Sequence, residues 1–243
     1  MIYKGVRGQV SYGQPIGILL LDYFAPFIPG DVGNASTYSF PVRYELVEGL
    51  TFERLLKQDR TALEPLIEAG KNLVKKHGVR AITADCGFFA LFQKEMANEL
   101  GVPVFMSSLL QVPFISSMIG KDNKVGILTS NAAGLDDTVY NAVGIDKSTI
   151  HVKGLETYEN FRGFGVDETG ILDREKIESE VVSAALDLVK EEPRVKSILL
   201  ECSMMPPYGA AVQRAVNLPV FDFITMINYV HSSVVKKEFQ GIM

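Results

Sequence analysis

Two cysteines, Cys86 and Cys202, occupy matching places in this 243-residue chain and could do acid/base chemistry. Each directly follows an apolar, strand-like run that ends in an acidic residue, over 79–85 and 195–201. The two runs lie 116 residues apart, and a proline stands 17 residues beyond each cysteine. The repetition indicates that the two thiols belong to two copies of one unit.

A second pair of similar segments, residues 15–20 and residues 124–129, lies at an offset of 109. Apolar residues also recur at helical spacing over 52–74 and 177–188, the latter behind a predicted N-cap at Asp173. Apolar strands that alternate with helices are typical of parallel sheets covered on both faces. The sequence therefore predicts two α/β domains with parallel sheets, related by a pseudo-twofold axis, with a cleft between them.

The predicted domain boundaries follow from this layout. The first domain covers residues 1–115 and the second covers 116–221, with the crossover near 111–120. The last stretch is helical in pattern over 224–235. We expect this C-terminal segment, 222–243, to join the first domain.

The position of the cysteines suggests what they could do. Ligands of parallel α/β sheets bind at the carboxyl ends of the strands, where the following helices present free N–H groups. A thiol placed there is expected to have a lowered pKa. Two thiols on opposite faces of an acidic C–H could remove a proton on one side and return one on the other. Buried structural thiols are the alternative, which the matched positions of Cys86 and Cys202 argue against.

Three motifs carry a family resemblance: Ala-Asp-Cys-Gly-Phe-Phe at 84–89, Glu-Cys-Ser-Met-Met-Pro-Pro-Tyr at 201–208, and the loop 29–34 with the following run 40–44. The chain resembles the aspartate/glutamate/hydantoin racemase family over essentially its whole length. The resemblance implies two α/β domains, no cofactor, and one catalytic cysteine from each domain, so that Cys86 and Cys202 form the acid/base pair.

The residues after each cysteine depart from the family pattern. Amino-acid racemases of the family often have Cys-Asn-Thr and Cys-Thr-His, whereas this chain has Gly87 and Phe88 after the first cysteine and Ser203 and Met204 after the second. These four residues are predicted to contact the substrate, in a pocket more apolar than aspartate or glutamate would require. Decarboxylases of the fold keep one cysteine, and the presence of both here favours inversion or isomerisation.

Further substrate contacts are predicted in the loops that follow the first strand of each half. In the first half, Asp31 and Asn34 could bind an amino or amide group, and Arg43 is either a carboxylate partner or an ordinary surface arginine. In the second half, Ser130 and Asn131 lie at a predicted helix start. We prefer them to Arg43 as carboxylate binders, because a helix N-terminus holds an anion without a buried charge.

Two features have open interpretations. Asp85 and Glu201, directly before the cysteines, are either satisfied carboxylates that point away from the thiols or groups that change the thiol pKa. A carboxylate near a thiol would raise the thiol pKa and oppose the effect of the helix. The segment 154–170 either closes over the cleft or runs along the surface.

Composition excludes several classes of protein. Lysine and arginine number 24 against 29 acidic residues, so no basic surplus indicates a nucleic-acid partner. The three histidines lack ligand spacing, so no metal site is predicted. No apolar run approaches the roughly 20 residues of a membrane helix. With two cysteines, the chain is expected in a reducing compartment, the cytoplasm.

The leading functional prediction is a cofactor-independent racemase or epimerase of a small amino acid, hydantoin or related carboxylate. The alternatives are a cis-trans isomerase of an unsaturated diacid with a covalent cysteine adduct, and a non-catalytic protein that binds a metabolite. A thiol redox protein is disfavoured because the chain has no Cys-x-x-Cys pair. A small-molecule substrate is expected, and the formation of a homo-oligomer stays open.

Overall fold

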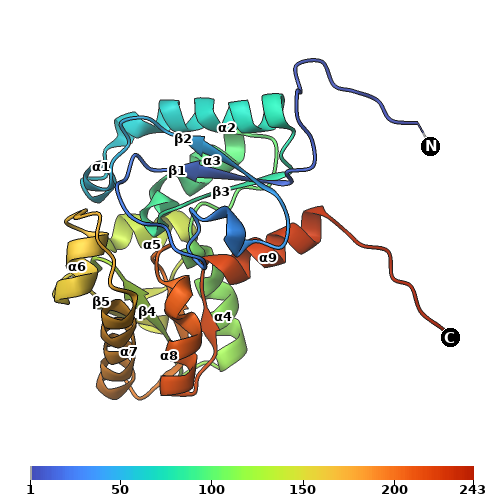
Figure 1. Ribbon diagram of the computed structural model, residues 1–243. Coiled ribbons are helices and arrows are strands. Elements are labelled where there is room, and N and C mark those ends of the chain that lie inside the picture. Colours follow the sequence, from blue (N-terminus) through green and yellow to red (C-terminus); the bar gives the residue numbers. More distant parts are fainter. Residues whose placement is uncertain (1) are drawn as a thin grey trace.

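The structure has two halves, each built around its own parallel β-sheet. The computed structural model describes residues 2–243. Figure 1 shows β1 to β3 in the upper half and β4 and β5 in the lower half. The strands are β1 (Ile16–Leu20), β2 (Val42–Leu46), β3 (Ala81–Ala84), β4 (Lys124–Thr129), β5 (Ile150–Gly154), β6 (Val195–Leu200) and β7 (Val220–Phe221). The predicted α/β architecture with two parallel sheets is confirmed.

The strand order of the two sheets reflects the duplication. β1 lies between β2 and β3, and β4 lies in the same way between β5 and β6. Ile82 of β3 forms an isolated parallel bridge with Val104, and Ile198 of β6 pairs with Val220 of β7. Both pairs keep the offset of the cysteine runs (198 − 82 and 220 − 104, each 116). The repeat found in the sequence therefore corresponds to a repeat of the sheet in the structure.

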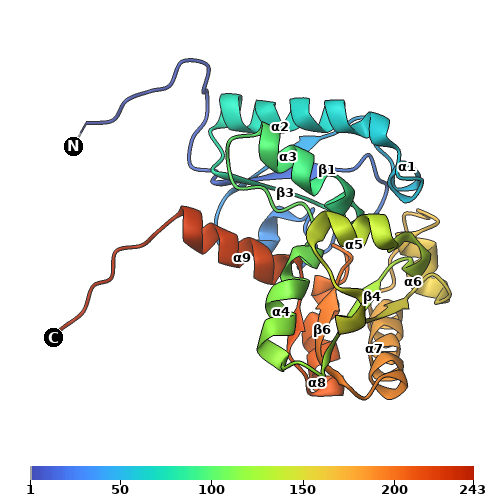
Figure 2. The same cartoon turned by 180° about the vertical axis from the view of Figure 1, so that it is seen from behind.

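The helices cover both faces of the sheets, as the apolar strands require. In the described chain they are α1 (Phe52–Leu56), α2 (Leu63–His77), α3 (Gln93–Glu99), α4 (Val112–Ile119), α5 (Asp137–Val143), α6 (Glu159–Gly165), α7 (Arg174–Glu191), α8 (Gly209–Val216) and α9 (Phe223–Val234). Asp173 caps α7 as predicted, its side chain accepting a hydrogen bond from the Lys176 N–H. Figure 2 shows the same two-part arrangement from behind.

Two edge strands and one helical stretch have weak signals in the sequence. β2 and β5 are edge strands that are only partly buried, so they lack the continuous apolar run of a central strand. The stretch directly after Cys86 is not one continuous α-helix. It is a buried 3-10 helix, Gly87–Phe92, followed by the short α3. Since all six residues of the 3-10 helix are buried, this stretch has no polar face.

The C-terminal helix α9 packs on the first half of the molecule. Phe223 and Ile227 of α9 are fully buried against Ile16 and Ile18 of β1. Helix α2 covers the other face of this sheet, where its Leu73 packs in the same core as the β1 and β3 side chains. Helix α9 thus packs on the sheet of the first half, and the domain boundaries, with the assignment of 222–243 to the first domain, stay a prediction.

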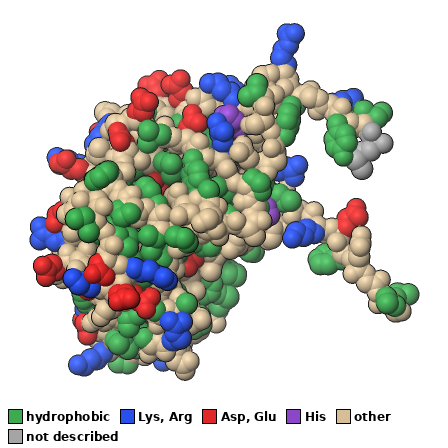
Figure 3. Space-filling view, viewed as in Figure 1, with side chains coloured by type: hydrophobic (Ala, Val, Ile, Leu, Met, Phe, Trp, Pro, Cys, Tyr) green, Lys and Arg blue, Asp and Glu red, His purple; other side chains and the backbone are tan. Residues whose placement is uncertain are grey.

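No helix within residues 2–243 combines the length and apolar character needed to cross a bilayer. The surface in Figure 3 carries charged side chains of both signs, and the two terminal segments extend away from the body.

The packing of α9 generates the first testable prediction. Replacing Phe223, whose ring is fully buried, by alanine should lower the free energy of unfolding by about 3–5 kcal/mol, because it leaves a cavity under β1. Tyr229 lies on the same helix but is 74% exposed, so Tyr229→Ala should change stability by less than about 0.5 kcal/mol. Urea unfolding of both variants measures the difference, and equal losses would show that α9 is not anchored through Phe223.

Candidate active site

The two cysteines meet in one cavity between the halves. Cys86 follows β3 and Cys202 follows β6, so each thiol lies beyond the carboxyl end of the equivalent strand. The cavity is lined by residues of both halves: Leu21, Tyr23, Phe27, Phe52, Asp85, Cys86, Gly87, Ser130, Gly165, Glu201, Cys202, Ser203 and Met204. Both thiols are free and buried. The juxtaposition that the duplication predicted is therefore present.

The backbone N–H groups two residues beyond each cysteine favour its thiolate. The N–H of Phe88 lowers the pKa of Cys86, and the N–H of Met204 lowers the pKa of Cys202. Burial and the charge of Glu201 have larger effects, and both pKa values are raised above the ordinary value of a thiol. The predicted lowering of the thiol pKa is therefore wrong, because burial and a neighbouring carboxylate outweigh the short 3-10 helices that follow.

Asp85 and Glu201 both line the cavity, and the charge of each raises the pKa of both thiols. The Asp85 Oδ1 accepts a hydrogen bond of 3.0 Å from the Leu21 N–H, and burial raises the pKa of this carboxyl to about 8. The Glu201 Oε2 accepts one of 2.8 Å from the Thr129 hydroxyl, and burial raises the Glu201 pKa to about 7. Of the two sequence interpretations, the one in which these carboxyls change the thiol pKa applies.

Hydrogen bonds across the seam hold the two halves together beside the thiols. The Ser203 hydroxyl donates to the backbone carbonyl of Asp85, and the Val32 N–H donates to the Ser203 carbonyl over 3.4 Å. The Ser108 hydroxyl lies 3.2 Å from the Glu201 carbonyl. The first of these bonds joins the residue before Cys86 to the residue after Cys202. Together these bonds fix the relative position of the two thiols.

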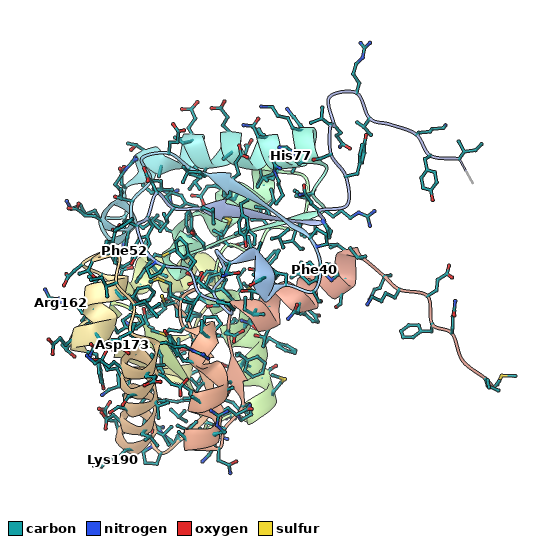
Figure 4. The ribbon with its side chains drawn as sticks, viewed as in Figure 1. Phe40, Phe52, His77, Arg162, Asp173 and Lys190 are labelled. Carbon is teal, nitrogen blue, oxygen red and sulfur yellow. The ribbon has the colours of Figure 1, made fainter. Side chains whose placement is uncertain are left out.

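Aromatic side chains form the rest of the wall. The rings of Tyr23 and Phe27 lie 6.4 Å apart between centroids, and the Tyr23 hydroxyl donates to the Phe164 carbonyl over 3.2 Å. Phe52 comes from α1, and Figure 4 shows it at the seam between the upper and lower halves. Its ring packs on Phe88, 5.8 Å away between centroids. The site thus combines acidic, thiol and aromatic groups.

The segment that contains α6 covers one side of the cavity. Gly165 lines it, and the Phe24 N–H donates to the Glu168 carboxylate over 3.1 Å. Arg162 of α6 pairs with Asp167 and points outward in Figure 4. The open volume next to the thiols is only about 20 Å³.

Among the residues predicted to bind substrate, four line the cavity: Gly87, Ser130, Ser203 and Met204. The other four are absent from its wall. Asn34 and Asn131 cap short 3-10 helices, and Phe88 packs into the core against Gly134. Asp31 is buried and accepts a hydrogen bond from the Gly33 N–H, with a pKa raised to about 7 by burial. Their direct contact with a substrate therefore has no support in this arrangement, and the role of the lining four stays a proposal.

The sequence interpretation missed the aromatic wall. Tyr23 and Phe27 follow β1, so the rule that places ligands at strand carboxyl ends, applied to β1 as well as to β3 and β6, would have included them. Phe52 carries no such signal, because it follows β2, an edge strand that is only partly buried and lacks a continuous apolar run. Arg43 lies on β2 and is absent from the cavity wall, so it has no part in this site.

A second, wider cavity lies at the opposite end of β1. It has a volume of about 510 Å³ and is lined by residues that include His77, Arg80, His231 and Lys237. Neither thiol lines it. Within residues 2–243 no group of three His, Cys, Asp or Glu side chains is arranged to hold a metal ion. Of these two cavities, the thiol cavity is thus the one in which both cysteines and two buried carboxyl groups, Asp85 and Glu201, come together.

Curated proteins of similar sequence decide the family. A dimethylsulfoniopropionate lyase of Durusdinium sp. clade D is 35% identical over 221 residues, which cover 88% of this chain and 73% of that protein. The chain belongs to the dimethylsulfoniopropionate lyase family. Dimethylsulfoniopropionate lyase 5 of Emiliania huxleyi (strain CCMP1516) is 31% identical over 231 residues, 90% of this chain but only 45% of that relative. No protein-family profile matches the chain.

Solved structures show the fold of this dimethylsulfoniopropionate lyase family member. Glutamate racemase of Bacillus anthracis aligns with a TM-score of 0.59 at 15% identity, over 90% of this chain and 82% of the other. Unliganded arylmalonate decarboxylase aligns with a TM-score of 0.56 at 14% identity, over 93% and 95%. The fold is the Asp/Glu/hydantoin racemase-like fold, as the resemblance implied. Fold and family support an enzyme, but the names of the sequence relatives favour a lyase and leave the isomerase prediction unconfirmed.

The raised pKa of Asp85 predicts how stability depends on pH. A carboxyl whose pKa is raised on folding holds a proton that the unfolded chain has already lost, so stability falls as pH rises toward the folded pKa. The free energy of unfolding should therefore decrease between about pH 4 and pH 8, and Asp85→Asn should flatten this slope. Urea unfolding at a series of pH values in this range measures the slope.

Asp59→Asn is the control, because the pKa of Asp59 is lowered to about 2 and this carboxyl titrates outside the range. An unchanged slope in Asp85→Asn would contradict the assignment.

Proposed function

We propose that this protein is a lyase that acts on dimethylsulfoniopropionate or a closely similar sulfonium carboxylate. One thiolate removes a proton from the carbon next to the carboxylate, the electron pair forms the carbon–carbon double bond, and the carbon–sulfur bond breaks. Dimethyl sulfide and acrylate leave, and the proton remains on the cysteine until it passes to water. The proposal extends to this chain the activity for which its relatives are named.

The observation that carries the proposal is the charge of the cavity wall. Two carboxyl groups, two thiols and three aromatic rings line the cavity, and none of the described residues in its wall is Lys, Arg or His. Such a wall suits a cation, because aromatic faces bind it through their quadrupole and no basic side chain of the wall repels it. A substrate such as aspartate, which carries two carboxylates, would meet no basic partner there. A sulfonium group supplies the positive charge that the site lacks.

A cationic substrate would also help to activate the thiol. Burial and nearby carboxylates hold both thiol pKa values high, so the empty site disfavours a thiolate. A sulfonium ion beside Cys86 or Cys202 lowers the thiol pKa by direct attraction. In this scheme the cationic substrate binds first, and its charge then favours loss of the proton from the neighbouring thiol. The thiolate base therefore forms only in the substrate complex.

A racemase or epimerase remains the second candidate, because two thiols line one cavity. Elimination needs one base, whereas inversion needs a base on one face and an acid on the other. The two candidates differ in their products. A lyase releases dimethyl sulfide and acrylate, and a racemase releases only the inverted substrate.

Removal of each thiol tests the reaction. The wild-type protein should release dimethyl sulfide from dimethylsulfoniopropionate, measured by gas chromatography, and removal of the basic thiol should lower kcat by about 100-fold or more. We expect Cys86→Ser and Cys202→Ser to differ, because one thiol acts as base and the other only contacts the substrate. No release by the wild type, together with loss of optical activity from an amino acid or hydantoin, would favour the racemase.

The aromatic wall is tested by a matched pair of substitutions at Tyr23. Tyr23→Leu removes the ring, and KM for the sulfonium substrate should rise roughly 3- to 30-fold, the range of a cation–π contact of about 0.5–2 kcal/mol. Tyr23→Phe keeps the ring but removes the hydroxyl that donates to the Phe164 carbonyl, so it should raise KM much less. Equal effects of the two variants would assign the role to the hydroxyl rather than to the ring.

A further inference from the structure

The Glu201 side chain has one oxygen without a hydrogen-bond partner. Glu201 is 0% exposed, and its Oε2 accepts from Thr129, but its Oε1 is buried and unpartnered. The carboxyl group lies over Gly87, where a Cβ would overlap it, and it lines the thiol cavity. A buried carboxylate oxygen left unpaired is costly, whereas a protonated oxygen that faces a ligand is a ready donor.

The groups that face Glu201 include no cation among the described residues of the cavity wall. They are the thiols of Cys86 and Cys202 and the hydroxyl of Thr129, and the Glu201 charge also raises the pKa of Tyr140 on α5. Asp31 and Asp85 raise the pKa of Cys202, and Asp85 also raises that of Cys86. A negative charge on Glu201 therefore opposes a thiolate on either cysteine, and no basic side chain offsets it.

We propose that Glu201 takes part in the reaction in its protonated form and donates a hydrogen bond from Oε1 to the carboxylate of the substrate. This inference rests on the proposed lyase function. When the α-proton leaves, negative charge develops on the substrate carboxylate, and a neutral acid that donates to it stabilises that charge. The same proton removes the charge that opposes the thiolate. Both effects come from one group, in a wall with no lysine or arginine to bind a carboxylate.

Glu201→Gln separates a protonated donor from an ionised base. The glutamine amide can still accept from Thr129 and donate toward the cavity at every pH. We expect kcat/KM of Glu201→Gln to stay within about tenfold of wild type near pH 6. In the wild type kcat/KM should decline above about pH 7 as Glu201 loses its proton, and in Glu201→Gln this decline should be absent. A loss of about 100-fold or more at all pH values, with the fold intact by circular dichroism, would overturn the inference.

Thr129→Val is the matched second variant. The Thr129 hydroxyl donates to Oε2 and lowers the pKa of Glu201, so its removal should move the decline in kcat/KM to higher pH. Movement to lower pH, or no movement, would contradict the assignment of this decline to Glu201.

A direct measurement keeps the inference testable apart from the lyase activity. Infrared spectra of the wild type at pH 6 should contain a carboxylic acid C=O band that is absent from Glu201→Gln and diminishes as pH rises above 7. A wild type that releases no dimethyl sulfide but shows this band would refute the proposed function and leave the protonated Glu201 in place. A wild type that releases dimethyl sulfide but lacks the band would refute the inference alone.

Discussion

The burial of acidic groups without a counter-cation is the physical constraint on which this site depends. Asp85, Glu201 and two thiols share a cavity wall that, among the described residues, contains no basic side chain. Ionising any one of them makes ionising the others harder, so the empty site holds its protons. In the proposed reaction, a positively charged substrate offsets this effect and makes a thiolate accessible.

The duplication of the chain brings these acidic groups together. Each half supplies one strand that ends in an acidic residue and a cysteine, and the two strand ends meet across the seam. The hydrogen bond from Ser203 to the Asp85 carbonyl joins the two cysteine turns directly. Because each copy contributes a carboxyl as well as a thiol, duplication doubles the acidic groups along with the nucleophiles. A racemase-like fold thereby acquires a wall suited to a cation.

Much of the fold could be predicted from the sequence, because central parallel strands and capped helices leave strong local signals. Runs such as 79–86 and 195–202 are apolar on both faces, and Asp173 is a good N-cap for α7. The edge strands β2 and β5 and the 3-10 helix after Cys86 could not be predicted, because each owes its form to neighbours distant in sequence. The two cysteines were predicted to share a cleft from the duplication and the family resemblance, and four residues predicted beside or near them also line the cavity. The ring of Phe52 reaches the cavity only through the packing of α1.

The sequence by itself determined the duplication, the parallel sheets and the position of each thiol beyond a strand, since these depend on periodicity and on matched spacing. Only the tertiary structure decided the protonation of the site. The sequence suggested thiols activated by helix N-termini, but the chain buries Cys86 and Cys202 beside Glu201, and burial and charge outweigh the backbone donors. Such a balance depends on which groups meet and how much water reaches them. The local order of residues specifies neither which groups become neighbours nor how far water reaches them.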